Sequence, residues 1–174
     1  MIFYFSATGN SKYVAERVAG ATDDHLIFLR DAIRSRCYHF DVSLEKRIGF
    51  VVPAYCCGLP SILNFFVDKL RLSGYEDQYV YLVLTCGSAT GDAAGQLGKL
   101  LGKKGIALNA QFAGAMVDNN VTAHKIPDRE EIDRRLDGAE EYIDEACRAI
   151  RARGAGDYNR CQGALPGALT AASY

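Results

Sequence analysis

The first stretch of the chain constrains the fold more than any other. An apolar run, Ile2-Phe3-Tyr4-Phe5, ends abruptly in the polar segment Ser6–Ser11, and apolar residues at helical spacing follow it. This order predicts a buried strand, a loop and the start of a helix. The first N–H groups of a helix lack intrahelical partners and carry the positive end of the helix dipole. The stretch therefore predicts a site for a phosphate-like anion at the first helix.

The loop of this predicted anion site differs from two common nucleotide motifs. The GxxxxGK[ST] spacing of a P-loop and the GxGxxG fingerprint of dinucleotide-binding folds are both absent. The segment matches [ST]-x-T-G-N-[ST] instead, and it resembles the loop with which flavodoxins bind the phosphate of flavin mononucleotide (FMN). The resemblance implies FMN as the cofactor and these residues as its phosphate loop: Ser6, Ala7, Thr8, Gly9, Asn10 and Ser11. The alternative is a cluster of helix-capping residues in an α/β protein without a ligand.

Strand-like and helix-like patterns alternate along the chain, which indicates a parallel sheet with right-handed crossovers. We predict an α/β fold: a flavodoxin-like, doubly wound, five-stranded parallel sheet of order 2-1-3-4-5 between two helix layers. The segment between 30 and 46 is expected to be irregular, and a last long helix is expected from Asp128 to about Arg153. The predicted FMN-binding domain spans residues 1–153, and residues 154–174 form a Gly- and Ala-rich tail.

Composition and charge limit the partners. A chain of 174 residues with 49% apolar and 24% charged residues is sufficient for one domain with a sound core. The formal net charge of -1 indicates neither nucleic acid nor a membrane surface as a partner. No stretch approaches the roughly 20 apolar residues of a membrane-spanning helix. No basic segment precedes the strand at Ile2, so we expect no signal peptide and a cytoplasmic location.

Three loops are expected at one edge of the sheet, because ligands of doubly wound folds bind at the carboxyl ends of the strands beside the switch in strand order. These loops are 6–11, 53–60 and 86–91. Tyr55 follows the third strand closely, so we expect its ring to stack on the flavin. The second and third loops supply the remaining predicted FMN contacts: Pro53, Ala54, Tyr55, Cys56, Cys57, Gly58, Thr85, Cys86, Gly87 and Gly91. Asp92 is expected to cap the next helix rather than to contact flavin.

The second loop also resembles the P-x-Y-x-x-G-x-P loop of the flavodoxin-like domain in two-module proteins that carry a ferredoxin module as well. Tyr55, Gly58 and Pro60 match it, and the resemblance extends patchily to Asn119. No ferredoxin module follows here, so the resemblance implies a separate redox partner protein, of ferredoxin or reductase type. In flavodoxins a peptide of this loop flips when the flavin is reduced. We expect the Cys57–Gly58 or the Gly58–Leu59 peptide to do so, the alternative being a simple turn glycine.

The six cysteines are expected to be reduced thiols, and none forms a CxxC pair, so an iron–sulfur cluster of local spacing is not expected. Cys56, Cys57 and Cys86 fall in two loops of the same predicted edge. They form either a metal or thiol-redox site beside the flavin or, as we favour, a pocket packed with small, soft side chains. We predict no metal site and no catalytic residue.

Three functions stay open from the sequence. The first is an FMN-binding electron carrier between redox partner proteins. The second is an FMN-dependent oxidoreductase of the same fold that reduces a quinone or a similar acceptor with NAD(P)H. The third is a flavin-free interaction module that retains the loop. The oligomeric state is left open.

Overall fold

A computed structural model describes residues 1–117, 128–161 and 163. The predicted loop at 118–127 with Asn119, and most of the predicted tail, lie outside the described residues. The strands are β1 (Ile2–Tyr4), β2 (Leu26–Phe28), β3 (His39–Asp41), β4 (Arg47–Pro53), β5 (Arg71–Ser73), β6 (Tyr79–Cys86), β7 (Ala110–Ala115) and β8 (Gly156–Asn159). The helices are α1 (Asn10–Thr22), α2 (Leu29–Arg34), α3 (Ser61–Lys69), α4 (Ala93–Gly102) and α5 (Arg129–Arg151).

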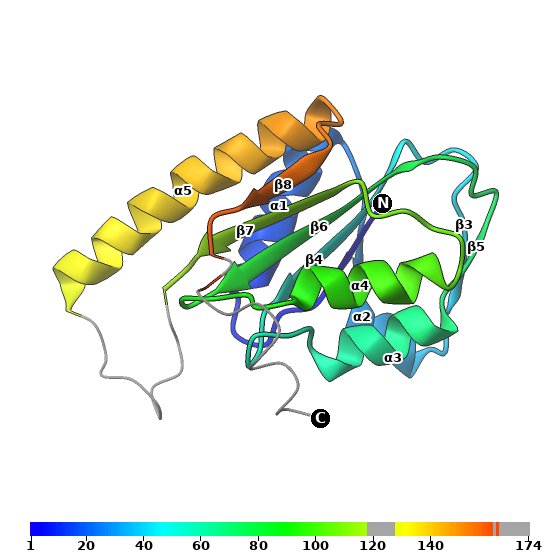
Figure 1. Ribbon diagram of the computed structural model, residues 1–174, viewed down its shortest axis with the longest axis horizontal. Coiled ribbons are helices and arrows are strands. Elements are labelled where there is room, and N and C mark those ends of the chain that lie inside the picture. The colour runs from blue at the N-terminus through cyan, green and yellow to red at the C-terminus, as the bar shows by residue number, and fades with distance from the viewer. Residues whose placement is uncertain (118–127, 162, 164–174) are drawn as a thin grey trace.

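The main sheet is parallel throughout and has the order β2-β1-β4-β6-β7-β8 (Figure 1). Its first five strands reproduce the predicted order 2-1-3-4-5, so the α/β flavodoxin-like fold is confirmed. The sheet has six strands rather than five, because β8 pairs with β7. β8 lies in the segment predicted as a tail after residue 153, so the sheet extends past that boundary.

The central strands β4 and β6 are continuous apolar runs because helices cover both faces of the sheet. Every residue of β6 is buried, as are the five residues Ile48–Val52 of β4. One small and one large residue are paired across β4 and β6. A side chain at Gly49 would overlap the ring of its register partner Tyr81. A glycine at position 49 therefore lets a large aromatic residue fill the core beside it.

Two helix layers enclose the sheet (Figure 1). α1 and α5 pack on one face around Val14, Val18 and Ile143. α2, α3 and α4 cover the other face around Leu63 and other buried side chains. Asp128 caps α5 as expected, since its Oδ1 accepts a hydrogen bond from the Glu131 N–H at 2.9 Å.

The segment 30–46, expected to be irregular, contains most of α2 and all of β3. β3 pairs with β5 in a separate two-stranded parallel sheet. The two strands have three residues each, too short to show an alternating pattern in the sequence. None of the helices among the described residues is both long and apolar enough to cross a bilayer.

Candidate functional site

The first loop connects β1 to the N-terminus of α1. Gly9 precedes the helix with φ 116°, in the region that favours glycine, and its carbonyl accepts the N–H of Tyr13 at 2.9 Å. The Gly9 N–H donates to the Ser6 hydroxyl at 3.1 Å. That hydroxyl keeps its own proton available for a further acceptor. The loop thus places the N-terminus of α1 directly after the carboxyl end of β1.

Two side chains of this loop brace it against neighbouring strands. The Ser11 and Thr85 hydroxyl oxygens lie 2.7 Å apart in a buried position at the end of β6. The Asn10 side-chain amide donates to the carbonyl of Val117, just beyond β7, at 3.0 Å. Both residues were predicted as phosphate ligands, and in the structure their side chains also position the loop.

The second loop is a tight two-residue turn. Tyr55 and Gly58 exchange backbone hydrogen bonds of 2.9 and 3.0 Å, which leaves Cys56 and Cys57 as the two central residues. Their φ values are 48° and 60°. Positive φ at both central positions is the type I′ arrangement, which favours Asn and Gly over residues such as cysteine. The turn therefore holds two cysteines in a conformation that costs conformational energy.

Both peptides predicted to flip carry hydrogen bonds in this turn. The Gly58 N–H donates to Tyr55, and the Gly58 carbonyl accepts from it. The Leu59 N–H donates to the side chain of Gln96 at 2.9 Å. The Gly58–Leu59 peptide is thus held on both sides and the Cys57–Gly58 peptide through its N–H. The flip stays a prediction.

The third loop follows β6 and is braced from the far edge of the sheet. Thr90 is fully buried, and its N–H donates to the Cys161 carbonyl at 2.8 Å. The Asn159 side-chain amide donates to the Thr90 hydroxyl at 2.8 Å. A side chain at Gly91 would overlap the Cys57 carbonyl oxygen, so the third loop also packs closely on the second. No local sequence signal identifies these contacts, because Asn159 and Cys161 are about seventy positions away in the chain.

These loops enclose a cavity of about 530 Å³ at the carboxyl ends of the central strands. Ser88, Ala89 and Val117 line it in addition to predicted residues. Three predicted residues support the loops without lining the cavity: Gly9, Gly58 and Gly91. The predicted residues that line it are Ser6, Ala7, Thr8, Asn10, Ser11, Pro53, Ala54, Tyr55, Cys56, Cys57, Thr85, Cys86 and Gly87.

The cavity lining combines polar and aromatic groups. The loop Ser6–Ser11 and the start of α1 provide polar groups. Tyr55 provides an aromatic ring, and 46% of its surface remains exposed. Partial burial raises the pKa of the Tyr55 hydroxyl, so this side chain is neutral at physiological pH. The arrangement suits a ligand that has an anionic group at one end and a flat ring at the other.

Two cysteines near the cavity have shifted pKa values, and the Cys86 thiol donates to the Gly114 carbonyl at 3.8 Å. A hydrogen bond with Cys161, followed by burial, raises the pKa of the Cys86 thiol far above its usual range. The same hydrogen bond lowers the pKa of Cys161 to about 7. Within the described part of the chain, no three His, Cys, Asp or Glu side chains are grouped as a metal site.

Asp92 lies at the N-cap position of α4, but its side chain accepts no capping hydrogen bond there. Its carboxylate lies instead over Gly95 and 3.8 Å from the Lys99 ammonium. It does not line the cavity. The expected position at the helix start is therefore correct, while the capping bond is not formed.

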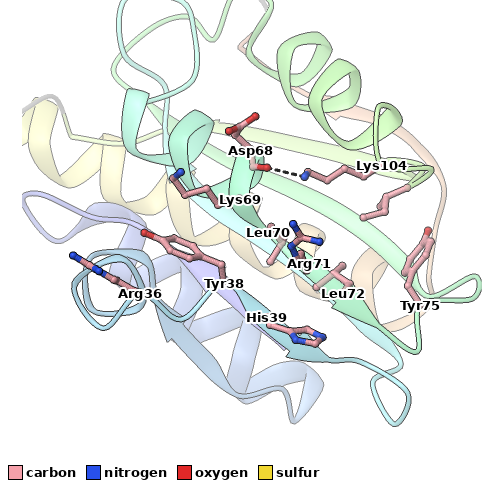
Figure 2. A pocket seen from close by; sticks show the side chains of 11 residues that line it. Arg36, Tyr38, His39, Asp68, Lys69, Leu70, Arg71, Leu72, Tyr75 and Lys104 are labelled. Atoms are coloured by element: carbon pink, nitrogen blue, oxygen red, sulfur yellow. Dashed lines mark hydrogen bonds between the residues drawn. The ribbon is translucent and has the colours of Figure 1, made fainter.

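A larger cavity of about 990 Å³ lies where α3 and α4 end, beside the β3–β5 ribbon (Figure 2). Parallel β/α units place that end of the helices at the amino ends of the strands, away from the three loops. The side chains of Arg36, Lys69, Arg71 and Lys104 give its lining a basic character. Lys104 donates to the Asp68 carbonyl at 2.8 Å. None of the predicted site residues lies there.

Solved structures with the same fold include several flavoproteins. The NAD(P)H:quinone oxidoreductase from Methanothermobacter marburgensis superposes with a TM-score of 0.55 at 13% identity, covering 89% of this chain and 95% of that one. The two-electron reduced flavodoxin of Megasphaera elsdenii gives 0.52 at 17% identity, with 86% and 100% covered. An FMN-dependent NADH-azoreductase from Bacillus anthracis, solved with FMN, gives 0.52 at 13% identity, with 86% and 99% covered.

At these identities the structural likeness shows the fold alone. No curated protein matches the sequence. The family assignment comes from the sequence itself, because residues 1–127 match the family model described as a flavodoxin domain. That range contains β1, β4 and β6 with all three loops of the cavity. The chain therefore belongs to the flavodoxin family.

Proposed function

We propose that the protein binds FMN in the cavity of the three loops and carries electrons between redox partner proteins. The observation that carries the proposal is the cavity of about 530 Å³ between the N-terminus of α1 and the ring of Tyr55. Two of the structural neighbours support it, since one is a flavodoxin and another was solved with FMN.

The residues present fit this cofactor. FMN has a phosphate at one end and a flat ring system at the other, and the cavity offers an anion-binding helix start and an aromatic side chain. Its volume lies within the about 300–1,000 Å³ range of ligand pockets. Gly9 has no atom within 4 Å of where a side chain would begin, so there is open space beside the residue that precedes the helix.

On this proposal the phosphate is held by the first N–H groups of α1 with the hydroxyls of Ser6 and Thr8. Tyr55 covers one face of the ring, and backbone groups at Cys86 and Gly87 meet its polar edge. Bound FMN supplies one- and two-electron transfer, and the protein supplies binding, orientation and exclusion of water.

FMN and riboflavin, compared by fluorescence titration, test the proposal. The two share the ring system, and only FMN has the phosphate. We expect riboflavin to bind about 10- to 100-fold more weakly, because it lacks charge-assisted hydrogen bonds to the first loop. Equal affinities would mean that the first loop does not bind the FMN phosphate. If neither flavin bound, the proposal would be wrong, and the flavin-free interaction module would be the function that stays open.

Matched variants locate the binding. Gly9→Ala places a side chain on a backbone of φ 116° and is expected to weaken FMN without affecting the larger, basic cavity. Arg71→Ala changes that basic cavity and is expected to leave FMN affinity unchanged. If Arg71→Ala weakened FMN binding and Gly9→Ala did not, the flavin would bind in the basic cavity, and our proposal would be wrong.

The second candidate is an FMN-dependent NAD(P)H:quinone oxidoreductase. The observation that favours it is that two small side chains, Cys56 and Cys57, line the cavity together with Tyr55. Steady-state oxidation of NADH and NADPH with a quinone distinguishes the two functions. Turnover supports the oxidoreductase. Potentiometric titration in two separate one-electron steps, without such turnover, supports the carrier.

A further inference from the structure

The cavity of about 990 Å³ beside the β3–β5 ribbon carries a charge that the chain as a whole does not have. The chain has 20 Lys and Arg residues against 21 Asp and Glu residues. The cavity is lined by Arg36, Lys69, Arg71 and Lys104, and Asp68 is its one acidic lining residue. Within the described part of the chain, none of these four cations forms an ion pair with a carboxylate. The cavity therefore has an excess of positive charge that suits an anion.

The helix ends explain only part of this charge. Lys69 lies in the last turn of α3, and Lys104 donates to the Asp68 carbonyl there, so both complement the dipole of that helix. Arg71 has no such partner, because it lies in β5, beyond the end of α3. Its register partner in β3 is His39, and both line the cavity. Basic side chains at paired positions of a sheet repel each other when both are protonated, and an anion bound beside them relieves this repulsion.

The cavity also has an apolar and aromatic part. The buried side chains of Leu70 and Ile106 line it, together with the partly buried rings of Tyr38 and Tyr75. In Figure 2 the two tyrosines lie apart, with Arg71 between them.

The two tyrosines differ in their surroundings. The Tyr38 ring already packs against Phe65 and Phe66, with centroid distances of 6.4 and 6.1 Å. This leaves the ring of Tyr75 as the better surface for a flat part of a ligand.

We propose that this cavity binds a nucleoside diphosphate such as ADP. A purely inorganic anion has no use for the apolar part of the lining, and a neutral aromatic molecule has none for the cations. A nucleoside diphosphate has both a flat base and two adjacent phosphates. Its phosphates are held by Lys69, Arg71 and Lys104, and its base packs on Tyr75. The cavity volume lies at the upper end of the range of ligand pockets, which gives room for such a molecule.

Isothermal titration calorimetry with the full-length chain tests the proposal. ADP is compared with adenosine, which lacks the phosphates, and with pyrophosphate, which lacks the base. We expect saturable binding of ADP with a Kd below about 1 mM, and binding of each part about 10-fold weaker or more. Absence of saturable ADP binding overturns the proposal. Equal affinities for ADP and pyrophosphate also overturn it, because the base would then have no role.

Lys104 and Lys103 provide a matched pair of variants. Both are exposed at the end of α4, and only Lys104 lines the cavity. Lys104→Ala is expected to weaken ADP binding about 10-fold, because a charge-assisted hydrogen bond is lost, and Lys103→Ala is expected to leave it unchanged. Equal weakening by both would show a general attraction to surface charge and would contradict the site.

Arg71→Ala gives a second loss of charge that does not depend on a structural contact. Among the described residues the Arg71 side chain makes no hydrogen bond or ion pair, so we expect the variant to keep the Tm of the parent protein. ADP binding is expected to weaken about 10-fold. Unchanged ADP affinity in this folded variant would contradict the proposed position of the phosphates.

Tyr75→Leu tests the position of the base. Leucine keeps an apolar side chain and removes the ring, so we expect ADP to bind about 5-fold more weakly and pyrophosphate to bind as before. Equal weakening of both ligands would contradict stacking of the base on Tyr75.

The ADP site is separate from the proposed FMN site, because the two cavities share no lining residue. FMN also has a ring and a phosphate, so the ADP titration is repeated with an excess of FMN. We expect the ADP affinity to stay the same. Displacement of ADP by FMN would place both ligands in one cavity and overturn the proposal. Failure of FMN to bind the protein leaves the expected ADP results unchanged, so the two proposals fail separately.

Discussion

The Ser11 and Thr85 hydroxyl oxygens lie 2.7 Å apart, buried between the first turn of α1 and the end of β6. One donates to the other, and together they fix the helix start relative to the central strand. Because Ser11 and Thr85 both line the cavity, this hydrogen bond holds the first loop and the end of β6 together within the cavity wall.

Replacing Thr85 by valine removes the partner of Ser11 while keeping the shape of the side chain. A buried hydroxyl left without its partner costs about 1–3 kcal/mol, so we expect the free energy of unfolding to fall by about that amount. Urea denaturation measures it. The double variant Ser11→Ala with Thr85→Val is expected to lose less than the sum of the single losses. Strict additivity would mean that the two hydroxyls are not coupled.

Gly91 and Gly98 differ sharply in what surrounds them. Gly91→Ala is expected to destabilise the protein by about 1–3 kcal/mol, because its φ is 55° and the new methyl group would overlap the Cys57 carbonyl. Gly98→Ala, on α4 with no atom within 4 Å, is expected to stabilise it by up to about 1 kcal/mol. Thermal unfolding of the two variants makes the comparison. Equal shifts in Tm would contradict the close packing of the second and third loops.

The turn at Cys56 and Cys57 should be stabilised by residues that adopt positive φ more readily than cysteine. Cys56→Asn combined with Cys57→Gly supplies the pair that type I′ turns favour, and we expect a gain of about 1 kcal/mol in the free energy of unfolding. Cys56→Ala with Cys57→Ala keeps the strain and is expected to bring no gain. A destabilised Asn-Gly variant would show that the cysteine side chains contribute more packing than the turn costs.

Asp24 should make the stability depend on pH in the acid range. Burial opposes its ionisation, but hydrogen bonds from Thr22 and Arg47 and the charges of Arg47 and the Met1 ammonium lower its pKa overall. The carboxylate therefore contributes stability above its unfolded pKa of about 3.9, and this contribution is lost as the pH falls through the lower pKa of the folded state.

The variant Asp24→Asn is expected to be less stable at pH 7 and to lose part of the acid dependence below about pH 4. Urea denaturation between pH 2.5 and 7 follows both effects. Asp77→Asn, at an exposed position, is the control and should leave the profile unchanged. If the pH profile of Asp24→Asn ran parallel to that of the parent protein, Asp24 would not be the source of the acid dependence of stability.

The strand order was predictable because the central strands are unambiguous in the sequence. Ile48–Val52 and the run of β6 are continuous apolar segments, and only burial on both faces explains such segments. β8 was not predictable, because Gly156–Asn159 is short and polar. Backbone pairing with β7 and stacking of Tyr158 on Phe112, with ring centroids 4.7 Å apart, stabilise it instead.

The position of the candidate site followed from topology, and its internal bracing did not. Parallel strands bring the three loops to one edge whatever their side chains do. The partners of Asn10, Ser11 and Thr90 lie far away in the chain, so no local pattern indicates them. The orientation of these side chains depends on packing that a single sequence does not reveal.

β8 also decides which strand edge the molecule presents to other molecules. A chain shortened at residue 153 would keep every residue that lines the cavity, yet β7, a six-residue strand of sequence AQFAGA, would become a bare edge. Uncovered edges of this kind pair with those of neighbouring molecules and lead to aggregation. In the full chain the four residues of β8 cover this edge of β7, and Asp157 places a charge on the covering strand.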